Sequence, residues 1–168
     1  MTHLLKTNQL QSHITQTLQP AYSARYHTLL TAIKTHLVPL GFSLPTPKRA
    51  DGVAGGFFLW LALPYVEGFV SAGEFARLCA REGGVVVSPG EVFEVPGDCS
   101  VGFGGCLRVC FAWVSEGELV EGVRRIERVA GRVLREGSGG KVEGEGEGES
   151  EREKGYVFVG RGDLSEFK

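Results

Sequence analysis

The run GGFFLWLALP at residues 55–64 decides the fold class of this 168-residue chain. Its seven apolar residues, 57–63, lie between two glycines and a proline, which is the pattern of a strand buried on both faces. We therefore expect a central strand of a sheet. The same run is far shorter than the roughly 20 apolar residues that cross a bilayer, so the sequence predicts no membrane-spanning segment.

A long helical pattern precedes this run. Its apolar residues recur every three or four positions, which places them on one face of a helix: Ile14, Leu18, Tyr22, Tyr26, Leu29, Ile33 and Leu37. Pro20 lacks a backbone donor, so we expect either a kink there or a helix that begins near it. Gly41 is the glycine expected just after a helix end.

A short helix and a short strand follow the run. Ser71 and Glu74 form a capping box, in which each side chain covers a free backbone N–H, and this predicts a helix to about Arg81. Residues 85–88, three valines and a serine, predict a short strand, which we expect to stop at Pro89.

A second strand and helix complete the pattern. Residues 106–112, CLRVCFA, predict a strand, and a second capping box at Ser115 and Glu118 predicts the start of the last helix. That helix has an apolar face made of Leu119, Val120, Val123, Ile126, Val129, Val133 and Leu134. The alternation of helices and strands predicts an α/β fold, a two-layer sandwich of three helices on three or four strands.

The composition divides the chain into three parts. We expect one folded domain over residues 1–136, a disordered Gly/Glu-rich linker over residues 137–155 and a tail over residues 156–168. The tail either docks as an edge strand through Tyr156 and Phe158 or stays undocked. Removing the linker's net charge of about −3 from the total of −2 leaves the rest near +1, which offers no broad field for nucleic acid.

The four cysteines form no CxxC pair. Cys106 and Cys110 are four residues apart on an extended segment, about 13 Å, which is too far to share one zinc ion. We therefore expect no metal site. Reduced thiols and the lack of a secretory leader predict a cytoplasmic protein.

Five stretches, in this order, resemble a known family: LQPAYSARYHTLLTAI, GGFFLWLALP, GGVVVSPGEVF, CLRVCFA and SEGELVEGVRRIERV. They are similar to the C-terminal part of the class I and II aminotransferases, in particular the fungal aminoadipate and aromatic aminotransferases, over roughly residues 10–135. The resemblance implies the small C-terminal domain of the fold-type-I architecture. It also implies pyridoxal 5′-phosphate, amino acid and 2-oxo acid substrates, and a large-domain partner or a homo-oligomer.

The family holds its cofactor as a Schiff base on a lysine that lies upstream of the matched region. No such Ser-Lys stretch occurs among the six lysines of this chain, which are Lys6, Lys34, Lys48, Lys141, Lys154 and Lys168. We therefore expect no catalytic and no cofactor-binding residue here, and weak or no binding of pyridoxal phosphate by the chain alone.

One site residue follows from the resemblance. Strand alternation in CLRVCFA places Leu107, Val109 and Phe111 on one face, and Arg108 and Cys110 on the other. Taken alone, Arg108 is a surface or salt-bridging residue. The resemblance implies that it binds the substrate α-carboxylate, a task that suits the planar, two-pronged guanidinium.

Two interpretations of the whole chain stay open. In the first it is part of an aminotransferase that is inactive alone, which the ordered motifs and Arg108 favour. In the second it is a stand-alone, non-catalytic α/β binding or interaction module, which the missing lysine favours.

Overall fold

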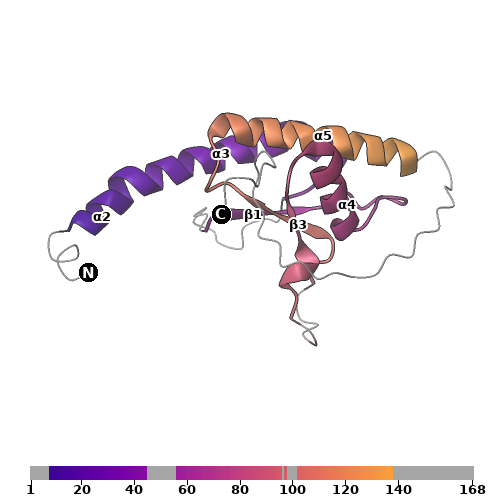
Figure 1. The fold of residues 1–168 in the computed structure, drawn as a ribbon, viewed down its shortest axis with the longest axis horizontal. Helices are drawn as coiled ribbons and strands as arrows, with labels where there is room; N and C mark the ends of the chain where they lie inside the picture. The colour runs from indigo at the N-terminus through magenta and orange to yellow at the C-terminus, as the bar shows by residue number, and fades with distance from the viewer. Residues whose placement is uncertain (1–7, 45–55, 96, 98–101, 138–168) are drawn as a thin grey trace, which may run out of the picture.

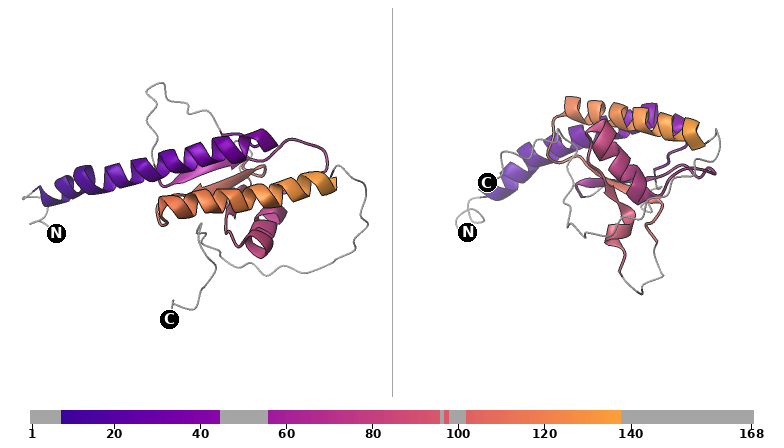
Figure 2. Two further views of the ribbon diagram at one scale, coloured as in Figure 1. Left: turned by 90° about the horizontal axis from the view of Figure 1, so that it is seen from above. Right: turned by 45° about the vertical axis from the view of Figure 1, so that its right-hand side comes forward.

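The computed structural model describes residues 8–44, 56–95, 97 and 102–137 (Figure 1). Within these residues three strands form one antiparallel sheet in the order β1-β3-β2: β1 Phe58–Ala62, β3 Cys106–Cys110 and β2 Ser88–Pro89. Three helices, α3 Gln19–His36, α4 Ala72–Leu78 and α5 Glu116–Gly137, pack over the sheet, with α3 and α5 side by side (Figure 2). The predicted two-layer α/β sandwich is confirmed. The predicted linker beyond Gly137 and the tail lie outside the described residues.

The position predicted for β1 is wrong. We expected a central strand, but β1 lies at the edge of the described sheet and β3 is central. On its outer side β1 carries only a single bridge, from Ala62 to Ser43. Both faces of β1 carry apolar residues because both are packed. Leu61 is fully buried in the core, and Trp60, on the opposite face, packs against aromatic rings described below.

The strand predicted at residues 85–88 is shorter and shifted. Only Ser88 and Pro89 pair with β3, and Pro89 is part of the strand that it was expected to end. The backbone N–H of Val85 instead donates to the carbonyl of Cys79, 3.0 Å away, which ties this segment to the preceding helical turn. Proline is tolerated in β2 because β2 is an edge strand.

The first helix runs through three consecutive segments: α2 Gln9–His13, the π-helical turn η1 Ile14–Leu18, and α3. Pro20 lies in the first turn of α3, but the helical run of which α3 is part begins earlier, at Gln9. A π turn inserts one residue, which is about 100° of rotation. Without it Ile14 would be about 100° out of phase with Ile33, so the turn keeps the apolar residues on one side.

Only the second half of this helical run is covered. Leu29, Ile33 and Leu37 are completely buried, whereas α2 and η1 contain no buried residue and extend beyond the body of the domain (Figure 1). At the far end Gly41 adopts a left-handed φ of 92° after a 3-10 turn at Val38–Leu40, where a glycine was predicted to end the helix.

The capping box predicted at Ser115 is present in full, whereas of the one predicted at Ser71 the structure shows the serine's half. The Ser71 hydroxyl accepts from the Glu74 N–H at 3.2 Å. At α5 the exchange is reciprocal, because Ser115 Oγ accepts from the Glu118 N–H at 3.3 Å and Glu118 Oε2 accepts from the Ser115 N–H at 2.8 Å. The helix predicted to reach about residue 81 ends as α4 at Leu78 and continues as a π-helical turn, η3 Cys79–Gly83.

The helical layer is joined by apolar packing and three polar links. The core includes Phe42, Phe75, Leu61, Leu107 and Ile126, all at most 2% exposed. Between α3 and α5, His36 Nδ1 lies 2.9 Å from Glu127 Oε2, and the Thr28 hydroxyl donates to Glu116 Oε2 at 2.7 Å. Arg25 Nη1 donates to the Ala112 carbonyl at 2.7 Å and so ties α3 to the end of β3. In the described ranges no helix is long and apolar enough to span a membrane.

Candidate functional site

Arg108 lies at the centre of the sheet. It is the middle residue of β3 and pairs with Trp60 of β1 on one side and Ser88 of β2 on the other. Its neighbours Leu107 and Val109 are buried under the helices, at 0% and 2% exposure, while Arg108 is half-buried on the opposite face. The predicted alternation along this strand is therefore confirmed.

The Arg108 guanidinium is flanked by two phenyl rings. Its central carbon lies 4.1 Å from the ring centre of Phe58 and 3.9 Å from that of Phe93. Phe58 comes from β1, and Phe93 ends the 3-10 turn η4 Gly90–Phe93. A cation over an aromatic face is attracted to the electron-rich ring, and two such rings restrict how the guanidinium plane can turn.

The charge of Arg108 has no protein counter-ion in the part of the chain that the structure describes. No carboxylate there lies within ion-pair distance, and no hydrogen bond from its N–H groups is made to these residues. The two phenyl faces offset part of the hydration that the half-buried cation loses, but they provide no hydrogen-bond acceptor for its N–H groups.

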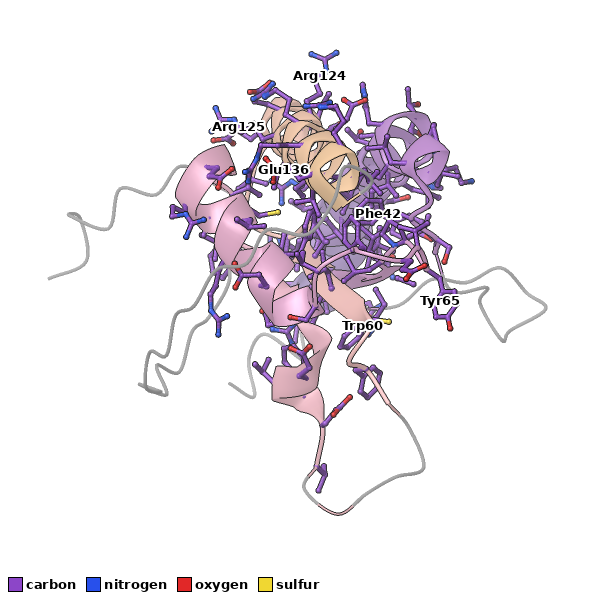
Figure 3. All side chains as sticks on the ribbon, turned by 90° about the vertical axis from the view of Figure 1, so that its right-hand side faces the viewer. Phe42, Trp60, Tyr65, Arg124, Arg125 and Glu136 are labelled. Carbon is purple, nitrogen blue, oxygen red and sulfur yellow. The ribbon has the colours of Figure 1, made fainter. Side chains whose placement is uncertain are left out.

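Two further rings extend this surface. Trp60, which is labelled in Figure 3, stacks on Phe103 with ring centres 4.7 Å apart and an angle of 23°, and it meets Phe93 edge-on at 5.6 Å. We call the four residues Phe58, Trp60, Phe93 and Phe103 the aromatic cluster. Its loop residue Phe103 is fixed because its backbone N–H donates to Glu94 Oε1 at 2.6 Å.

Gly90 permits this arrangement. A Cβ atom at Gly90 would overlap the carbonyl oxygen of Phe103, so no residue with a side chain fits there without a backbone shift. The close approach of the two segments places Phe93 and Phe103 around Arg108.

Sequence reasoning missed the aromatic cluster. Phe58 and Trp60 carry a usable signal, because they alternate on β1 and share a face with Arg108 once the strands are paired. Phe93 and Phe103 lie in a 3-10 turn and a glycine-rich loop, where no periodicity indicates direction.

Ser88 is the buried polar residue beside Arg108. It pairs with Arg108 across β2 and β3, so the two residues share one face of the sheet. Ser88 is 1% exposed, and its hydroxyl has no hydrogen-bond partner among the described residues. Buried hydroxyls ordinarily make at least one hydrogen bond, and the Ser88 hydroxyl makes none with these residues.

The described residues do not fit pyridoxal phosphate by themselves. Lys34 is the one lysine in the described ranges, and it is exposed on α3, in the helical layer, whereas Arg108 is on the opposite face of the sheet. The other five lysines lie outside the described residues. A site for the cofactor needs an amine near the carboxylate site, and these residues provide none there.

The thiols offer no alternative chemistry. Cys79, Cys106 and Cys110 are unpaired, and Cys99 lies outside the described residues. Burial, with a smaller contribution from the nearby Glu82 carboxylate, raises the pKa of Cys79 to about 12, so it is protonated near neutral pH. In the described ranges no three His, Cys, Asp or Glu residues converge to hold a metal ion.

Comparison with known proteins decides the family. Residues 8–126 match the profile of the family "Aminotransferase class I and II". This chain belongs to the class I and II aminotransferases. As a curated relative, an uncharacterized protein of Saccharomyces cerevisiae, YER152C, is 28% identical over 106 residues, which are 63% of this chain and 22% of the yeast protein.

Solved aminotransferases share the fold. LysN, the α-aminoadipate aminotransferase of Thermus thermophilus in complex with N-(5′-phosphopyridoxyl)-L-leucine, is 27% identical with a TM-score of 0.58 over 75% of this chain. The multiple substrate aminotransferase of Thermococcus profundus is 25% identical with a TM-score of 0.61 over 79% of it. The kynurenine aminotransferase of Pyrococcus horikoshii, at 24% identity and a TM-score of 0.62 over 78% of this chain, shows the fold alone.

This aminotransferase chain spans 29% of LysN, 29% of the Thermococcus enzyme and 28% of the Pyrococcus enzyme. The family resemblance expected from the motifs is confirmed, and so is the α/β class of the domain.

Proposed function

We propose that this aminotransferase domain supplies the substrate-carboxylate site of a pyridoxal-phosphate-dependent transaminase. Arg108 binds the α-carboxylate that an amino acid and its 2-oxo acid have in common. The observation that carries the proposal is the position of its guanidinium between Phe58 and Phe93, at 4.1 and 3.9 Å, without a carboxylate partner in the described residues.

The surroundings of Arg108 suit an anion that binds and leaves. The guanidinium presents two parallel N–H donors to a carboxylate, and each charge-assisted bond is stronger than a neutral one. The phenyl rings exclude water from two sides, which strengthens the attraction relative to an exposed ion pair. Because the same carboxylate is present before and after amino transfer, Arg108 would hold substrate and product alike.

The amine-bearing part of the active site would come from a large domain. The described residues place no lysine beside Arg108, and the matched aminotransferases are more than three times as long as the matched segment. We therefore propose that the chain alone binds pyridoxal phosphate weakly or not at all and has no transaminase turnover. The unpaired thiols favour a reducing compartment, and we place the protein in the cytoplasm.

A chimera tests the assignment of Arg108. Residues 8–137 replace the structurally matched segment of Thermus thermophilus LysN, which supplies the cofactor and its lysine. In this chimera Arg108→Ala should raise the KM for the amino acid and for the 2-oxo acid together by about 100-fold, because two charge-assisted hydrogen bonds are lost. The absorption band of the bound cofactor should be unchanged.

The matched control is Arg77→Ala, which removes an exposed arginine on α4 whose partner is Glu74. It should leave both KM values within about twofold, since surface ion pairs contribute little. Equal KM values in the chimera with and without Arg108, for both substrates, would refute the assignment. A loss confined to kcat would also contradict it, because a binding residue acts on both substrates' affinity.

A further inference from the structure

The outward face of α5 carries a row of arginines. At about 100° per residue, Arg124, Arg128 and Arg135 fall within about 40° of one another around the helix axis. Arg132 lies at the edge of the row, and we call these four residues the arginine stripe. Arg124 points away from the body of the domain (Figure 3), and the Arg128 side chain is 65% exposed.

The local glutamates do not neutralise the arginine stripe. Glu121 lies 3.7 Å from Arg128 but is already engaged by Arg125 at 2.9 Å. Arg132 pairs with Glu82 and with Glu136. Arg124 and Arg135 have no ion pair with any residue that the structure describes. The exposed face therefore has a surplus of positive charge.

We propose that the chain's own acidic segment, residues 143–153 with the sequence EGEGEGESERE, lies along the arginine stripe. Its six glutamates occupy every second position. In an extended chain alternate side chains point to one side, about 6.6 Å apart. Arginines four residues apart on a helix are about 6 Å apart along its axis. The two patterns therefore match in sign. Arg124 and Arg128 also match the glutamates in spacing, whereas Arg128 and Arg135, seven residues apart, are separated by about 10.5 Å.

The connection permits this contact. α5 ends at Gly137, and residues 138–142, SGGKV, contain two glycines before the first glutamate of the segment. The segment can therefore turn back and run antiparallel to α5, with Glu143 nearest Arg135. Because it belongs to the same chain, its effective concentration at the stripe is on the order of mM.

The length of the contact is limited by charge. The arginine stripe covers about 16 Å from Arg135 to Arg124 at 1.5 Å per residue. Beyond it, Glu116 and Glu118 in the first turn of α5 repel further glutamates. The first four glutamates of the segment span about 20 Å, which is enough to cover the stripe.

NMR of the full chain tests the contact. The side-chain Nε–Hε signals of Arg124, Arg128 and Arg135 are compared between the native chain and a variant in which all six glutamates of residues 143–153 are changed to glutamine. At about 20 mM salt we expect these signals to differ between the two chains. The difference should shrink at about 0.5 M salt, because the Debye length falls to a few ångströms.

Two controls keep this result specific. Arg77 pairs with Glu74 on α4 and has no contact with the stripe, so its signal should be the same in both chains. The difference should also be independent of protein concentration. Identical Arg124, Arg128 and Arg135 signals in the two chains would overturn the proposal. So would a difference that vanishes on dilution, because the segment would then come from a second copy.

A reciprocal variant changes the other partner. The reciprocal variant combines Arg124→Gln, Arg128→Gln and Arg135→Gln. In it the backbone amide signals of residues 143–153 should show faster motion than in the native chain. The control variant Arg77→Gln should leave these signals as they are in the native chain. Duplex DNA of 20 base pairs is the final probe. The glutamine variant of the acidic segment should bind it more tightly than the native chain does. Equal binding by both would mean that the stripe is open to nucleic acid, and would overturn the proposal.

Discussion

The guanidinium carbon of Arg108 lies 3.9 Å from the centre of the Phe93 ring, although the two residues are fifteen positions apart in the sequence. β3 provides the arginine, and the turn after β2 provides the phenyl ring. The other ring, Phe58, comes from β1 on the opposite side of β3. β1, β3 and the turn that follows β2 therefore all contribute to the orientation of one cation.

Removing the Phe93 ring should weaken substrate binding without removing the charge. In the LysN chimera we expect Phe93→Ala to raise the KM for both the amino acid and the 2-oxo acid by about tenfold, because the guanidinium loses one cation–π contact and one wall that excludes water. Steady-state kinetics measures the change. The adjacent Val92→Ala, at a side chain that is 63% exposed, should leave KM unchanged. An effect of Val92→Ala as large as that of Phe93→Ala would contradict a role for the ring.

Replacing Ser88 with alanine should increase the stability of the domain. The Ser88 hydroxyl is buried without a partner in the described residues, so Ser88→Ala removes an unsatisfied group. We expect the free energy of unfolding to rise by about 1 kcal/mol and Tm by about 4 °C.

Ser71→Ala is the matched comparison, because that serine caps α4 through the Glu74 N–H. It should lower the free energy of unfolding by about 1 kcal/mol. Thermal and urea unfolding of the two variants measure both changes. A stability loss in Ser88→Ala would show that the hydroxyl has a partner.

The thiols should differ in their reaction with iodoacetamide at pH 8. Burial raises the pKa of Cys79 to about 12 and also raises the pKa of Cys106, but Cys106 is partly exposed. We expect alkylation of Cys106 well before Cys79, as measured by mass spectrometry of digested samples over time. In urea all of the thiols should react at similar rates, which controls for the reagent.

The same pKa shift makes a prediction for stability at high pH. Below the ordinary thiol pKa of 9.0, Cys79 is protonated in the folded and the unfolded chain alike. Between pH 9 and 12 only the unfolded chain loses the proton, so the free energy of unfolding falls as pH rises. In Cys79→Ala this contribution should be absent, and urea unfolding at pH 8 and pH 10 should show a smaller difference than in the native chain. An equal loss in both chains would contradict the assignment to Cys79.

Local signals in the sequence were sufficient for part of this fold. The capping boxes at Ser71 and Ser115 predicted two helix starts, because the bonds involved join residues three positions apart. Strand alternation also predicted the face that carries Arg108. The central place of β3 could not be predicted, since strand order depends on long-range pairing that a period of two does not encode.

The candidate site shows the same limit. The family resemblance identified Arg108, but not what surrounds it. Phe93 and Phe103 lie in irregular segments, and their directions depend on the close approach of Gly90 to the Phe103 carbonyl. The sequence also could not predict that the Ser88 hydroxyl is buried without a partner among the described residues, because this depends on the register between β2 and β3.

The uncovered half of the first helix should cause the isolated chain to associate. Leu10, Ile14 and Leu18 lie on segments without a buried residue, and no Asp, Glu, Lys or Arg occurs between residues 8 and 24. Exposed apolar surface of this kind promotes contact between chains. We therefore expect sedimentation velocity to show a concentration-dependent increase in mass, accompanied by binding of a hydrophobic dye.

Substitutions at the two ends of this helical run should separate association from folding. Ile14→Gln/Leu18→Gln should reduce both association and dye binding while leaving Tm within about 2 °C, because neither side chain contributes to the core. Ile33→Ala, at a completely buried position, should instead lower the free energy of unfolding by about 2–5 kcal/mol. A chain that stays monomeric at high concentration without binding dye would contradict the prediction. So would a large loss of Tm in Ile14→Gln/Leu18→Gln, because it would mean that the first half of the helix is covered by the chain itself.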